Sequence, residues 1–315
     1  MSVIKYKPFA ERTVDGQYHK LLKEIMDNGK TKIPIHASLP ENAHLNHVDS
    51  KDITGYQLNY DLSNGFPLQT IRGFEKGFFG SLAEIHAFLN GARTLDELNK
   101  FGVPEFFWGP SVTKEKCAVF GLKEGDLGPG SYGAVLRNMP GPDGTYFDQI
   151  QALEEKIKKS PQARTLMVTT WDPRYALGDK SQGYPRSVVV APCHGTDTLI
   201  KIYPDGDMHV HTTQRSADAP VGLIGNITQW CVFGMMIADL FDLNFTKYVY
   251  SLPDAQIYDI QYDKVTELLK REARKLPTVQ LKPQVKRNHI WEYQPKDFIL
   301  TDYNPHPGMR MDVTV

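Results

Sequence analysis

Residues 191–218 read APCHGTDTLIKIYPDGDMHVHTTQRSAD, and the hairpin that they predict organises the rest of the chain. Alternating apolar residues indicate strands over Thr198–Tyr203 and Met208–Thr213, and a Pro-Asp-Gly turn separates them. Because a hairpin folds its two ends onto each other, residues before the first strand and after the second are expected to be neighbours. The sequence therefore predicts that Cys193 and Arg215 lie on neighbouring strands.

Cys193 is the first candidate for chemistry at this end of the hairpin. A thiol becomes a nucleophile when nearby cations and hydrogen-bond donors stabilise its thiolate form. Arg215 can supply the cation, and a hydroxyl, a carboxylate and an amide follow at Ser216, Asp218 and Asn226. Taken alone, a free cysteine is more often a buried structural thiol, because it packs as a small hydrophobe. The arginine favours the interpretation as a nucleophile.

The composition is that of an ordinary globular protein. The chain has 315 residues, of which 41% are hydrophobic and 23% charged, so it can bury a substantial core. A net charge of -1 does not indicate binding to nucleic acid, and no basic run indicates binding to a membrane surface. Small anionic molecules remain compatible with local arginines. We therefore expect neither a nucleic-acid partner nor a membrane partner.

The cysteines favour a reducing compartment. Cys117, Cys193 and Cys231 are an odd number without close spacing, which favours neither a disulfide framework nor a metal site. The first residues lack the apolar core of a signal peptide, and the most apolar stretch, about 227–241, is too short to span a bilayer. We expect a cytoplasmic protein without a bound metal, in which residues 227–241 form a buried helix.

Outside the hairpin, the hydrophobic pattern predicts a mixture of helices and adjacent strands. Helical spacing occurs over residues 17–27, 81–90, 146–159 and 263–274, and strand-like patterns over residues 56–62, 165–171, 187–191 and 247–251. Residues 30–51 predict a loop, and residues 101–142, rich in glycine, proline and aromatics, predict long ordered loops. Because regular βαβ alternation is absent, we expect the α+β class. One domain over residues 1–315, with a polar extension at about 1–16, accounts for the pattern.

The helix predicted over residues 81–90 carries a carboxylate in an apolar setting. Ser81 is expected to cap this helix and Gly91 to close it. Glu84 falls among the apolar residues, and a buried carboxylate without a neighbouring cation needs a reason. Either a role in proton transfer or an arginine distant in sequence would supply that reason.

Several further motifs occur in order along the chain. They are Asn226, eight residues after Asp218, and the runs DLSNGFPL (61–68), GDLGP (125–129) with Tyr132-Gly133, DAQIY (254–258) and PHPG (305–308). Together with PCH (192–194) and QRSAD (214–218), these motifs resemble the thymidylate synthase family from about residue 56 onward. The resemblance implies an α+β fold in which a mixed sheet packs with helices, and a homodimer assembled through the sheet.

The resemblance also implies roles for the candidate catalytic residues. In such enzymes the thiolate, here Cys193, adds to carbon 6 of a pyrimidine ring and makes carbon 5 nucleophilic. Asn226 matches a residue that reads the uracil edge of dUMP, because relatives that use cytosine nucleotides tend to carry an aspartate there. Glu84 matches a glutamate that orders water and transfers protons, Tyr132 a residue that helps remove the carbon 5 proton, and His194 takes a supporting role. Without the resemblance, an N-cap, a core aromatic and a structural histidine would explain Asn226, Tyr132 and His194 as well.

The remaining matches describe the binding of the nucleotide and of the co-substrate, which would be methylenetetrahydrofolate. The residues that the resemblance places around the nucleotide are Gln214, Arg215, Ser216, Gln256 and Tyr258, with Arg164 reaching in from the neighbouring subunit. Those that it places around the folate are Asp218 and Gly222 at the pterin, Arg72 at the glutamyl portion, and Phe106 or Trp108 as the stacking aromatic. A tail ending at Val315 would close over the folate.

The chain departs from the family pattern around the phosphate and the ribose. An arginine-containing RTGTG loop is not recognisable over residues 29–52, where His44 or His47 could act as the donor instead. Thr165 stands at the second of two paired arginines, and Gln256 stands in place of a histidine near the ribose hydroxyl. These departures predict an altered phosphate subsite.

Three functions are compatible with these residues. Thymidylate synthesis, in which a hydride reduces a methylene intermediate to dTMP, is the main expectation, because the tail that shields the site matches the family. Water in place of hydride would make the protein a dUMP hydroxymethylase, as in phage modified-base synthesis, and an altered stacking aromatic favours that outcome. A relative that binds nucleotide or regulates RNA without turnover is the third interpretation. The joint presence of Cys193, Glu84, Tyr132 and Asn226 argues against it.

Overall fold

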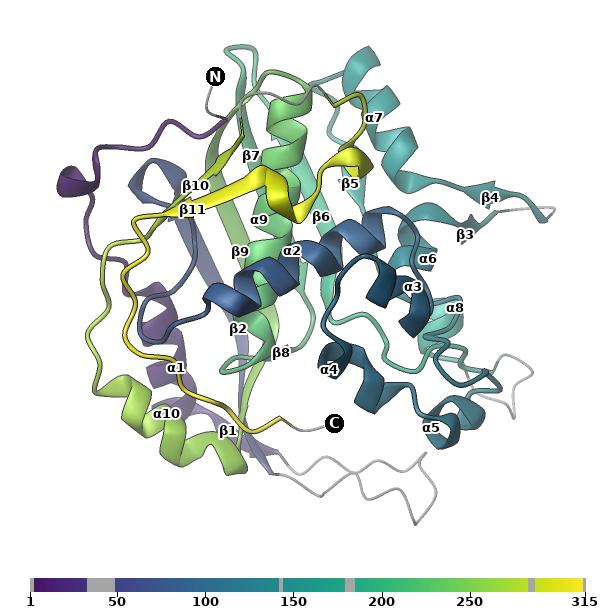
Figure 1. Ribbon diagram of the computed structural model, residues 1–315, viewed down its shortest axis with the longest axis horizontal. Coiled ribbons are helices and arrows are strands. Elements are labelled where there is room, and N and C mark those ends of the chain that lie inside the picture. Colours follow the sequence, from purple (N-terminus) through teal and green to yellow (C-terminus); the bar gives the residue numbers. More distant parts are fainter. Residues whose placement is uncertain (1–2, 33–48, 142–143, 179–184, 283–286, 314–315) are drawn as a thin grey trace.

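One seven-stranded sheet dominates the fold (Figure 1). The computed structural model describes residues 3–32, 49–141, 144–178, 185–282 and 287–313. The strands in spatial order are β1 (Lys30–Lys32), β2 (Ser50–Asp61), β9 (Asn244–Tyr258), β7 (Asp207–Gln214), β6 (His194–Ile202) and β5 (Met167–Val168), with β8 (Ala217–Asp218) also paired to β9. β7 and β8 run parallel to β9 and the other neighbours are antiparallel. The predicted α+β class and mixed sheet are confirmed.

Helices and short hairpins surround the sheet. The α-helices in the described ranges are α1 (Gln17–Asn28), α2 (Glu75–Leu89), α3 (Leu95–Lys100), α4 (Glu105–Trp108), α5 (Lys114–Val119), α6 (Tyr132–Arg137), α7 (Gln149–Lys159), α8 (Pro173–Ala176), α9 (Gly222–Leu240) and α10 (Tyr262–Leu269). The two small hairpins are β3 (Met139–Pro140) with β4 (Tyr146–Phe147), and β10 (Thr278–Leu281) with β11 (Phe298–Thr301). Figure 1 shows α9 lying along the sheet and α2 crossing over α9.

Helix α9 forms the centre of the core. Trp230 and Phe233 of this helix are fully buried, as are Met208 and Val210 at alternate positions of β7. Each such side chain contributes roughly 1.5–3 kcal/mol of burial free energy. In the described part of the chain, α9 alone has the length and hydropathy of a membrane span, but it is mostly buried inside the protein, as core helices are. The predicted buried helix is confirmed, and it begins earlier, at Gly222.

The central hairpin β6–β7 confirms the pairing predicted from its sequence. His194 pairs with Gln214, and the register shifts between His194 and Asp197. Gly195 lies in this irregularity with a φ of 61°, and an added Cβ would lie 1.8 Å from Cζ2 of Trp230. Only glycine therefore fits where β6 meets α9, and this close approach fixes the backbone that follows Cys193.

Two local predictions are wrong for identifiable reasons. Ser81 does not cap a helix, because α2 begins at Glu75 and the Ser81 hydroxyl donates to the carbonyl of Gly77 within the helix. Glycines lower the helix propensity of the first turns of α2, so the sequence pattern does not indicate a helix there. Tertiary packing overrides this low propensity. Residues 187–191 form no strand. The carbonyls of Val188 and Val189 accept hydrogen bonds from the guanidinium of Arg186 instead of from a neighbouring strand.

Other predicted boundaries change more modestly. The loop expected over residues 30–51 includes β1 and the start of β2, while His44 and His47 lie outside the described residues. The region 101–142 contains the short helices α4, α5 and α6 in addition to loops. The helix expected over 146–159 starts after the N-cap Asp148, and the one expected from residue 263 ends at Leu269.

Candidate active site

Cys193 lies immediately before β6, where the sequence analysis places the nucleophile. The residue is partly exposed, and its Sγ lies 3.6 Å from Nη2 of Arg215. The guanidinium of Arg215 also donates to the carbonyls of Pro192 at 2.8 Å and Ala191 at 2.9 Å, and it covers the ring of Trp171 at 4.9 Å. The hairpin therefore brings thiol and guanidinium together, and the backbone before the cysteine holds the guanidinium in place.

Two opposing effects act on the Cys193 thiol. Burial raises its pKa, because a thiolate is poorly solvated there, whereas Arg215 and Arg186 oppose the rise by their positive charges. Burial is the larger effect, so the pKa lies above its usual value. The expected influence of Arg215 is present, but in the ligand-free protein it does not outweigh the loss of solvation.

Glu84 is buried against α9, and amide and indole groups bind it in place of an arginine. Nε1 of Trp108 donates to one carboxyl oxygen at 2.5 Å, and Nε2 of Gln229 donates to the other. Burial raises the pKa of Glu84 to about 7, while these two donors lower it. The alternative of an arginine distant in sequence is wrong for the described residues. A carboxyl group with this pKa exchanges protons near neutral pH.

Tyr132, the first residue of α6, connects the core to the nucleophile. Its hydroxyl oxygen accepts a hydrogen bond from the backbone N–H of Cys193 at 2.7 Å and a longer one from that of His194 at 3.5 Å. Its ring stacks on Phe88 at 4.7 Å and on His194 at 4.5 Å. The phenol is thus fixed beside Cys193, and its own O–H remains a donor.

His194 is a neutral, positioned side chain. Nε1 of Trp230 donates to its Nδ1 at 2.9 Å, so the imidazole proton resides on Nε2. Burial lowers the pKa of His194 to about 3, which keeps it uncharged at neutral pH. This geometry suits a residue that orients Tyr132 and the cysteine loop, in line with the supporting role expected for it.

Asn226 lies in the second turn of α9 and not at its N-cap, so that alternative interpretation is wrong. Its side-chain amide makes no hydrogen bond to other residues in the described ranges and is partly exposed. An added Cβ on Gly222, one turn earlier, would lie 3.6 Å from its Nδ2, so the two residues share one face of the helix. Asn226 therefore keeps both its donors and its acceptor for a ligand.

The residues expected around the nucleotide divide into two groups. Gln214 is fully buried, where it accepts from the hydroxyl of Tyr250 at 2.6 Å and donates to the carbonyl of Ser216 at 2.9 Å. Gln256 accepts from the backbone N–H of Ala217 at 3.2 Å and donates to Oγ of Ser216 at 3.2 Å. Gln214 is therefore a structural support, whereas Ser216, Gln256 and, at 3.5 Å from Gln256, Tyr258 form a polar edge.

The residues expected around the folate gather at the C-terminal segment. Asp218 accepts from Nε2 of Gln261, which also donates to the carbonyl of Asp312 at 2.9 Å. Burial raises the pKa of Asp218 to about 7. Arg72 is buried and donates to the carbonyls of Met309, at 3.0 Å, and Pro220. Arg72 is thus no ordinary surface arginine, since it fastens the C-terminal segment to the body.

Four further candidates have separate positions. Of the two aromatics of α4, Trp108 is buried against Glu84, while Phe106 is 75% exposed. Arg164 lies between α7 and β5, and no hydrogen bond or ion pair joins it to any other residue among those described. Val315 lies outside the described residues, so the tail that ends there is followed only to residue 313.

Sequence reasoning missed three partners of these residues. Gln229 showed only as a polar interruption of the apolar stretch, and it is the donor to Glu84. Trp230, beside it in sequence, fixes His194. Arg186 is a second cation that acts on Cys193. A polar residue in an otherwise apolar helix is the one signal that could have indicated Gln229.

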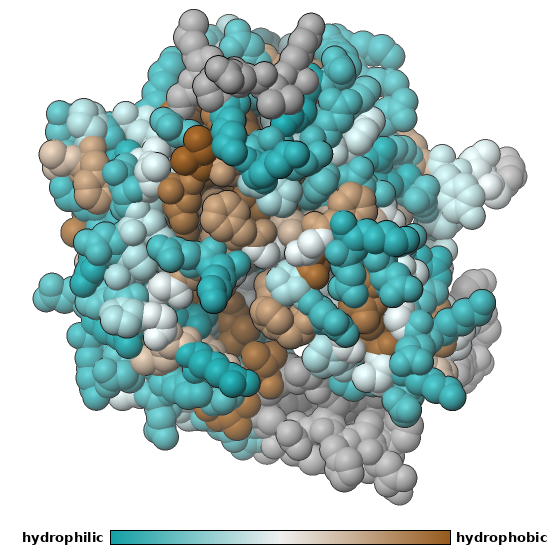
Figure 2. Space-filling model, viewed as in Figure 1, coloured by the Kyte–Doolittle hydropathy of each residue, from teal (hydrophilic) through white to brown (hydrophobic). Residues whose placement is uncertain are grey.

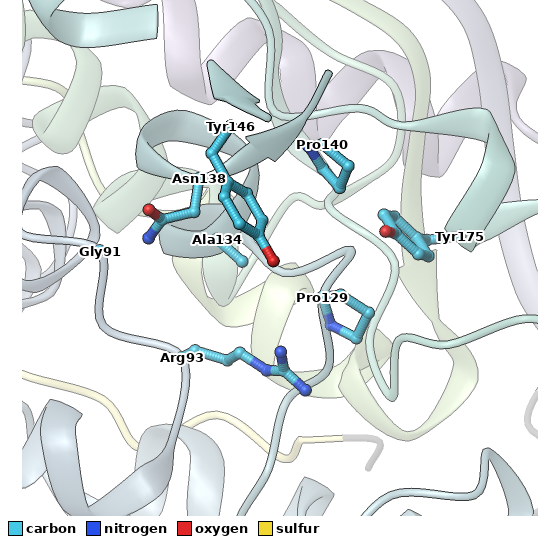
Figure 3. Close-up of a pocket in the computed structure, with 8 residues that line it drawn as sticks. All are labelled: Gly91, Arg93, Pro129, Ala134, Asn138, Pro140, Tyr146 and Tyr175. Atoms are coloured by element: carbon cyan, nitrogen blue, oxygen red, sulfur yellow. The ribbon is translucent and has the colours of Figure 1, made fainter. Parts of the chain in front are cut away.

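One described cavity lies apart from these residues. It has a volume of about 260 Å³ and contains no predicted site residue (Figure 3). Its lining consists of Gly91, Arg93, Pro129, Ala134, Asn138, Pro140, Tyr146 and Tyr175. Arg93, the cation of this cavity, already pairs with Asp126 through Nη2 at 2.7 Å. The candidate active site is therefore the Cys193 cluster and not this cavity.

Comparison with known sequences agrees with the predicted family. An α+β protein with a mixed sheet, a cysteine beside an arginine and a buried carboxyl group has the parts of an enzyme that works by covalent catalysis. A family profile described as Thymidylate synthase matches residues 16–315. The chain belongs to the thymidylate synthase family, whose members are folate-dependent one-carbon transferases that bind dUMP and use methylenetetrahydrofolate as co-substrate.

Proposed function

We propose that this protein is a thymidylate synthase that converts dUMP and methylenetetrahydrofolate to dTMP and dihydrofolate. The observation that carries the proposal is the single cluster of Cys193, Arg215, Tyr132 and Glu84. In the reaction, Sγ of Cys193 bonds to carbon 6 of the uracil ring, and the displaced electron pair forms an enolate. Carbon 5 attacks the one-carbon unit of the folate and then loses its proton, and the bond from the one-carbon unit to the folate nitrogen breaks, which leaves an exocyclic methylene. Hydride from the released tetrahydrofolate reduces this methylene to the methyl group and expels the sulfur from carbon 6, so that the folate leaves as dihydrofolate.

The electrostatic environment of Cys193 determines when its thiol loses a proton in the first step. Because the pKa of the thiol lies above its usual value, the free enzyme holds Cys193 mainly as the neutral thiol at pH 7. The adjacent guanidinium of Arg215 stabilises the thiolate as it forms. Deprotonation therefore accompanies attack on the ring.

Glu84 and Tyr132 handle protons around the ring. With a pKa of about 7, Glu84 can act as acid or base through ordered water near neutral pH. Tyr132, fixed by the backbone of Cys193, presents its O–H close to the sulfur and assists removal of the carbon 5 proton through water. His194 positions Tyr132 by stacking on it and stays neutral.

Asn226 reads the base. An amide can donate to one edge atom of uracil and accept from the next, and the side chain of Asn226 has no competing partner among the described residues. Its donor also stabilises the enolate. This pairing favours dUMP over dCMP.

The sugar and phosphate bind along Ser216, Gln256, Tyr258 and Arg215 in this proposal. Arg164 acts from the partner subunit of a homodimer, which explains why it has no partner in the described part of one chain. The sheet supports such a dimer, because alternate residues of β7 such as His211 remain partly exposed on the face away from α9. The active unit is then a cytoplasmic homodimer, each subunit one domain.

The folate binds between α9 and the C-terminal segment. Asp218 and Gly222 contact the pterin, Arg72 holds the segment that closes over it, and the tail ending at Val315 completes the closure. Figure 2 shows apolar side chains gathered near the middle of the face that carries α2 and this segment, a surface suited to aromatic rings.

A dUMP hydroxymethylase is the second candidate. The positions of the two aromatic residues on α4 favour it, because Trp108 donates a hydrogen bond to Glu84 and Phe106 is 75% exposed. An incompletely shielded methylene intermediate would react with water in place of hydride. A non-catalytic relative is the third candidate, and the intact Cys193 cluster argues against it.

Product identity separates these functions. Purified protein is incubated with dUMP labelled with tritium at carbon 5 and with methylenetetrahydrofolate, and the products are identified by mass spectrometry. A synthase yields dTMP and dihydrofolate, and a hydroxymethylase yields hydroxymethyl-dUMP and tetrahydrofolate. Binding of both ligands without tritium release would overturn both enzymatic proposals and support the non-catalytic relative.

A further inference from the structure

Two arginines hold the short segment that leads into Cys193. Arg186 donates from Nε to the carbonyl of Val188 at 3.0 Å and from Nη2 to that of Val189 at 2.9 Å. Arg215 holds the carbonyls of Ala191 and Pro192 in the same segment. Because two residues of chain span at most about 7 Å, the carbonyls of Val189 and Ala191 are neighbours on this segment. The two guanidiniums therefore bind adjacent parts of the segment that leads into the nucleophile.

Neither guanidinium forms an ion pair with a carboxylate in the ranges that the structure describes. The charge of Asp254 acts on Arg215 only from beyond ion-pair distance. Burial lowers the pKa of Arg186, and the positive charge of Arg215 lowers it further, as expected for two like charges near each other. Aromatic rings cover one face of each, Phe120 at 4.7 Å from Arg186 and Trp171 at 4.9 Å from Arg215. Two like charges held in this way gain free energy when an anion binds between them.

Both guanidiniums keep a donor free for that anion. Each uses Nε and Nη2 for carbonyl oxygens, and Nη1 of neither makes a hydrogen bond within the described ranges. Neither Nη1 is a buried unpaired atom, so both remain accessible to solvent. Two accessible N–H edges that belong to rigidly held cations suit a phosphate monoester, which offers several anionic oxygens.

Lys32, the other cation near this end of the sheet, is already neutralised. Its Nζ lies 3.3 Å from a carboxylate oxygen of Asp52 and 3.8 Å from one of Asp254. Its charge is therefore balanced before any ligand arrives, and Arg186 is the better candidate to supply the charge that the family pattern leads one to expect from residues 29–52.

We propose that Arg186 and Arg215 together form the phosphate subsite, so that Arg186 supplies a charge that the altered phosphate loop lacks. The inference rests on the proposed function in taking the phosphate to be that of a nucleotide such as dUMP. It adds a specificity residue, since Arg186 would distinguish a nucleotide from its nucleoside. Arg186 would gain this contact without leaving the carbonyls of Val188 and Val189.

Calorimetric binding of dUMP and of deoxyuridine tests the inference. Arg186→Ala should weaken dUMP binding roughly 10- to 100-fold, the loss expected for one charge-assisted contact. Deoxyuridine lacks the phosphate, so its affinity should change less than about threefold. Arg186→Lys, which keeps the charge, should retain part of the preference for dUMP. The matched control Lys32→Ala removes a cation that is already paired and should change the preference little.

A second measurement tests the phosphate subsite without enzymatic turnover and without a nucleobase. Iodoacetamide alkylation of Cys193, followed by peptide mass spectrometry, should be slowed by inorganic phosphate in the wild type and not in Arg186→Ala. Equal loss of dUMP and deoxyuridine binding, or an unchanged preference in both Arg186 variants, overturns the inference while leaving the proposed function intact. Phosphate protection that depends on Arg186, in a protein that does not bind dUMP, would instead overturn the proposed function alone.

Discussion

Two groups of polar side chains around Cys193 differ in how far the chain satisfies them. Each member of the proton network, Glu84, Tyr132 and His194, accepts hydrogen bonds that fix its position, although the O–H of Tyr132 remains a donor. The recognition set comprises Asn226, Arg164, Arg186 and Arg215, and each of its members keeps at least one polar atom without a protein partner in the described ranges. Because polar groups in proteins are normally paired, we expect the unpaired atoms of the recognition set to bind the ligand.

This difference separates two kinds of contribution. A network that is fixed before substrate arrives lowers the barrier, because its dipoles need no reorganisation during the reaction. A set of free donors contributes affinity and selectivity, because its hydrogen bonds form only with the correct ligand. Substitutions in the proton network should therefore act on kcat and on its pH dependence. Substitutions in the recognition set should act mainly on the choice and affinity of substrate.

Cys193→Ser should have the largest effect, because the cysteine lies where the two groups meet. Loss of the nucleophile is expected to lower kcat at least about 10⁴-fold, while dUMP binding and thermal unfolding stay close to wild type. Activity and binding are measured in parallel. Cys117→Ser, which alters the buried thiol of α5, is the control and should remain active. Substantial turnover by the serine variant would rule out the covalent route.

Glu84→Gln should affect the proton network next most strongly. Removing a general acid or base lowers rates by about 10²–10⁴-fold, with little change in dUMP affinity. The pH profile of kcat/KM in the wild type should show a limb near pH 7, which the glutamine variant lacks. An identical limb in both proteins would mean that another group, such as Asp218, titrates there.

Glu84→Gln should also change how the free energy of unfolding depends on pH. The pKa of Glu84 is raised from 4.5 to about 7 in the folded protein, so folding favours the protonated form. Its contribution is fully present below pH 4.5 and is lost as pH rises through 7, by up to about 3 kcal/mol. The free energy of unfolding in urea should therefore fall less between pH 5 and pH 8 in Glu84→Gln than in the wild type. Equal falls would contradict the raised pKa.

The sequence predicts the contact of Cys193 with Arg215 better than it predicts the partners of the proton network, and the reason is distance along the chain. Cys193 and Arg215 meet because a local hairpin pairs them, and a period of two with a turn signal is visible in the sequence. The contact of Gln229 with Glu84 spans 145 positions and arises from the packing of α9 on α2. No local pattern encodes such a pairing.

The same limit applies to the fold. The apolar run of α9 predicts a buried helix correctly, because a buried helix is apolar on every face. Residues 187–191 have the composition of a strand, yet Arg186 takes two of their carbonyls. Strand propensity describes a residue and not its hydrogen-bond partner. Val188 and Val189 are buried and Val190 is partly buried all the same, so the hydrophobic signal was right and only its structural interpretation was wrong.

Asn226→Asp should change specificity more than rate. A carboxylate accepts hydrogen bonds but cannot donate to the uracil oxygen, so kcat/KM for dUMP should fall about 10²-fold and that for dCMP should rise. Both values are measured with each nucleotide. Unchanged selectivity would remove Asn226 from the recognition set. A loss for both nucleotides would indicate damage to α9, which circular dichroism would detect.

Arg164→Ala tests whether the recognition set includes a second subunit. We expect the phosphate contact to be lost and KM for dUMP to rise about tenfold or more. In mixtures with Cys193→Ser at low dUMP, re-formed dimers contain one site with both wild-type residues, so activity should recover toward a quarter of the wild-type value. Arg174→Ala, which removes an arginine paired with Asp172, is the control. No recovery after confirmed subunit exchange would place Arg164 in its own site or outside any site.

Trp108→Phe should have the smallest effect and tests the link between α4 and the proton network. Phenylalanine keeps an aromatic ring but has no N–H for Glu84. Because that hydrogen bond lowers the pKa of Glu84, its loss should move the pH limb of kcat/KM upward from about 7. Phe106→Leu, on the exposed side of the same helix, should leave the limb in place and change only the share of water-derived product. An unmoved limb in the Trp108 variant would show that its hydrogen bond does not set the pKa of Glu84. A shifted limb in the Phe106 variant would show that the effect is not specific to that hydrogen bond.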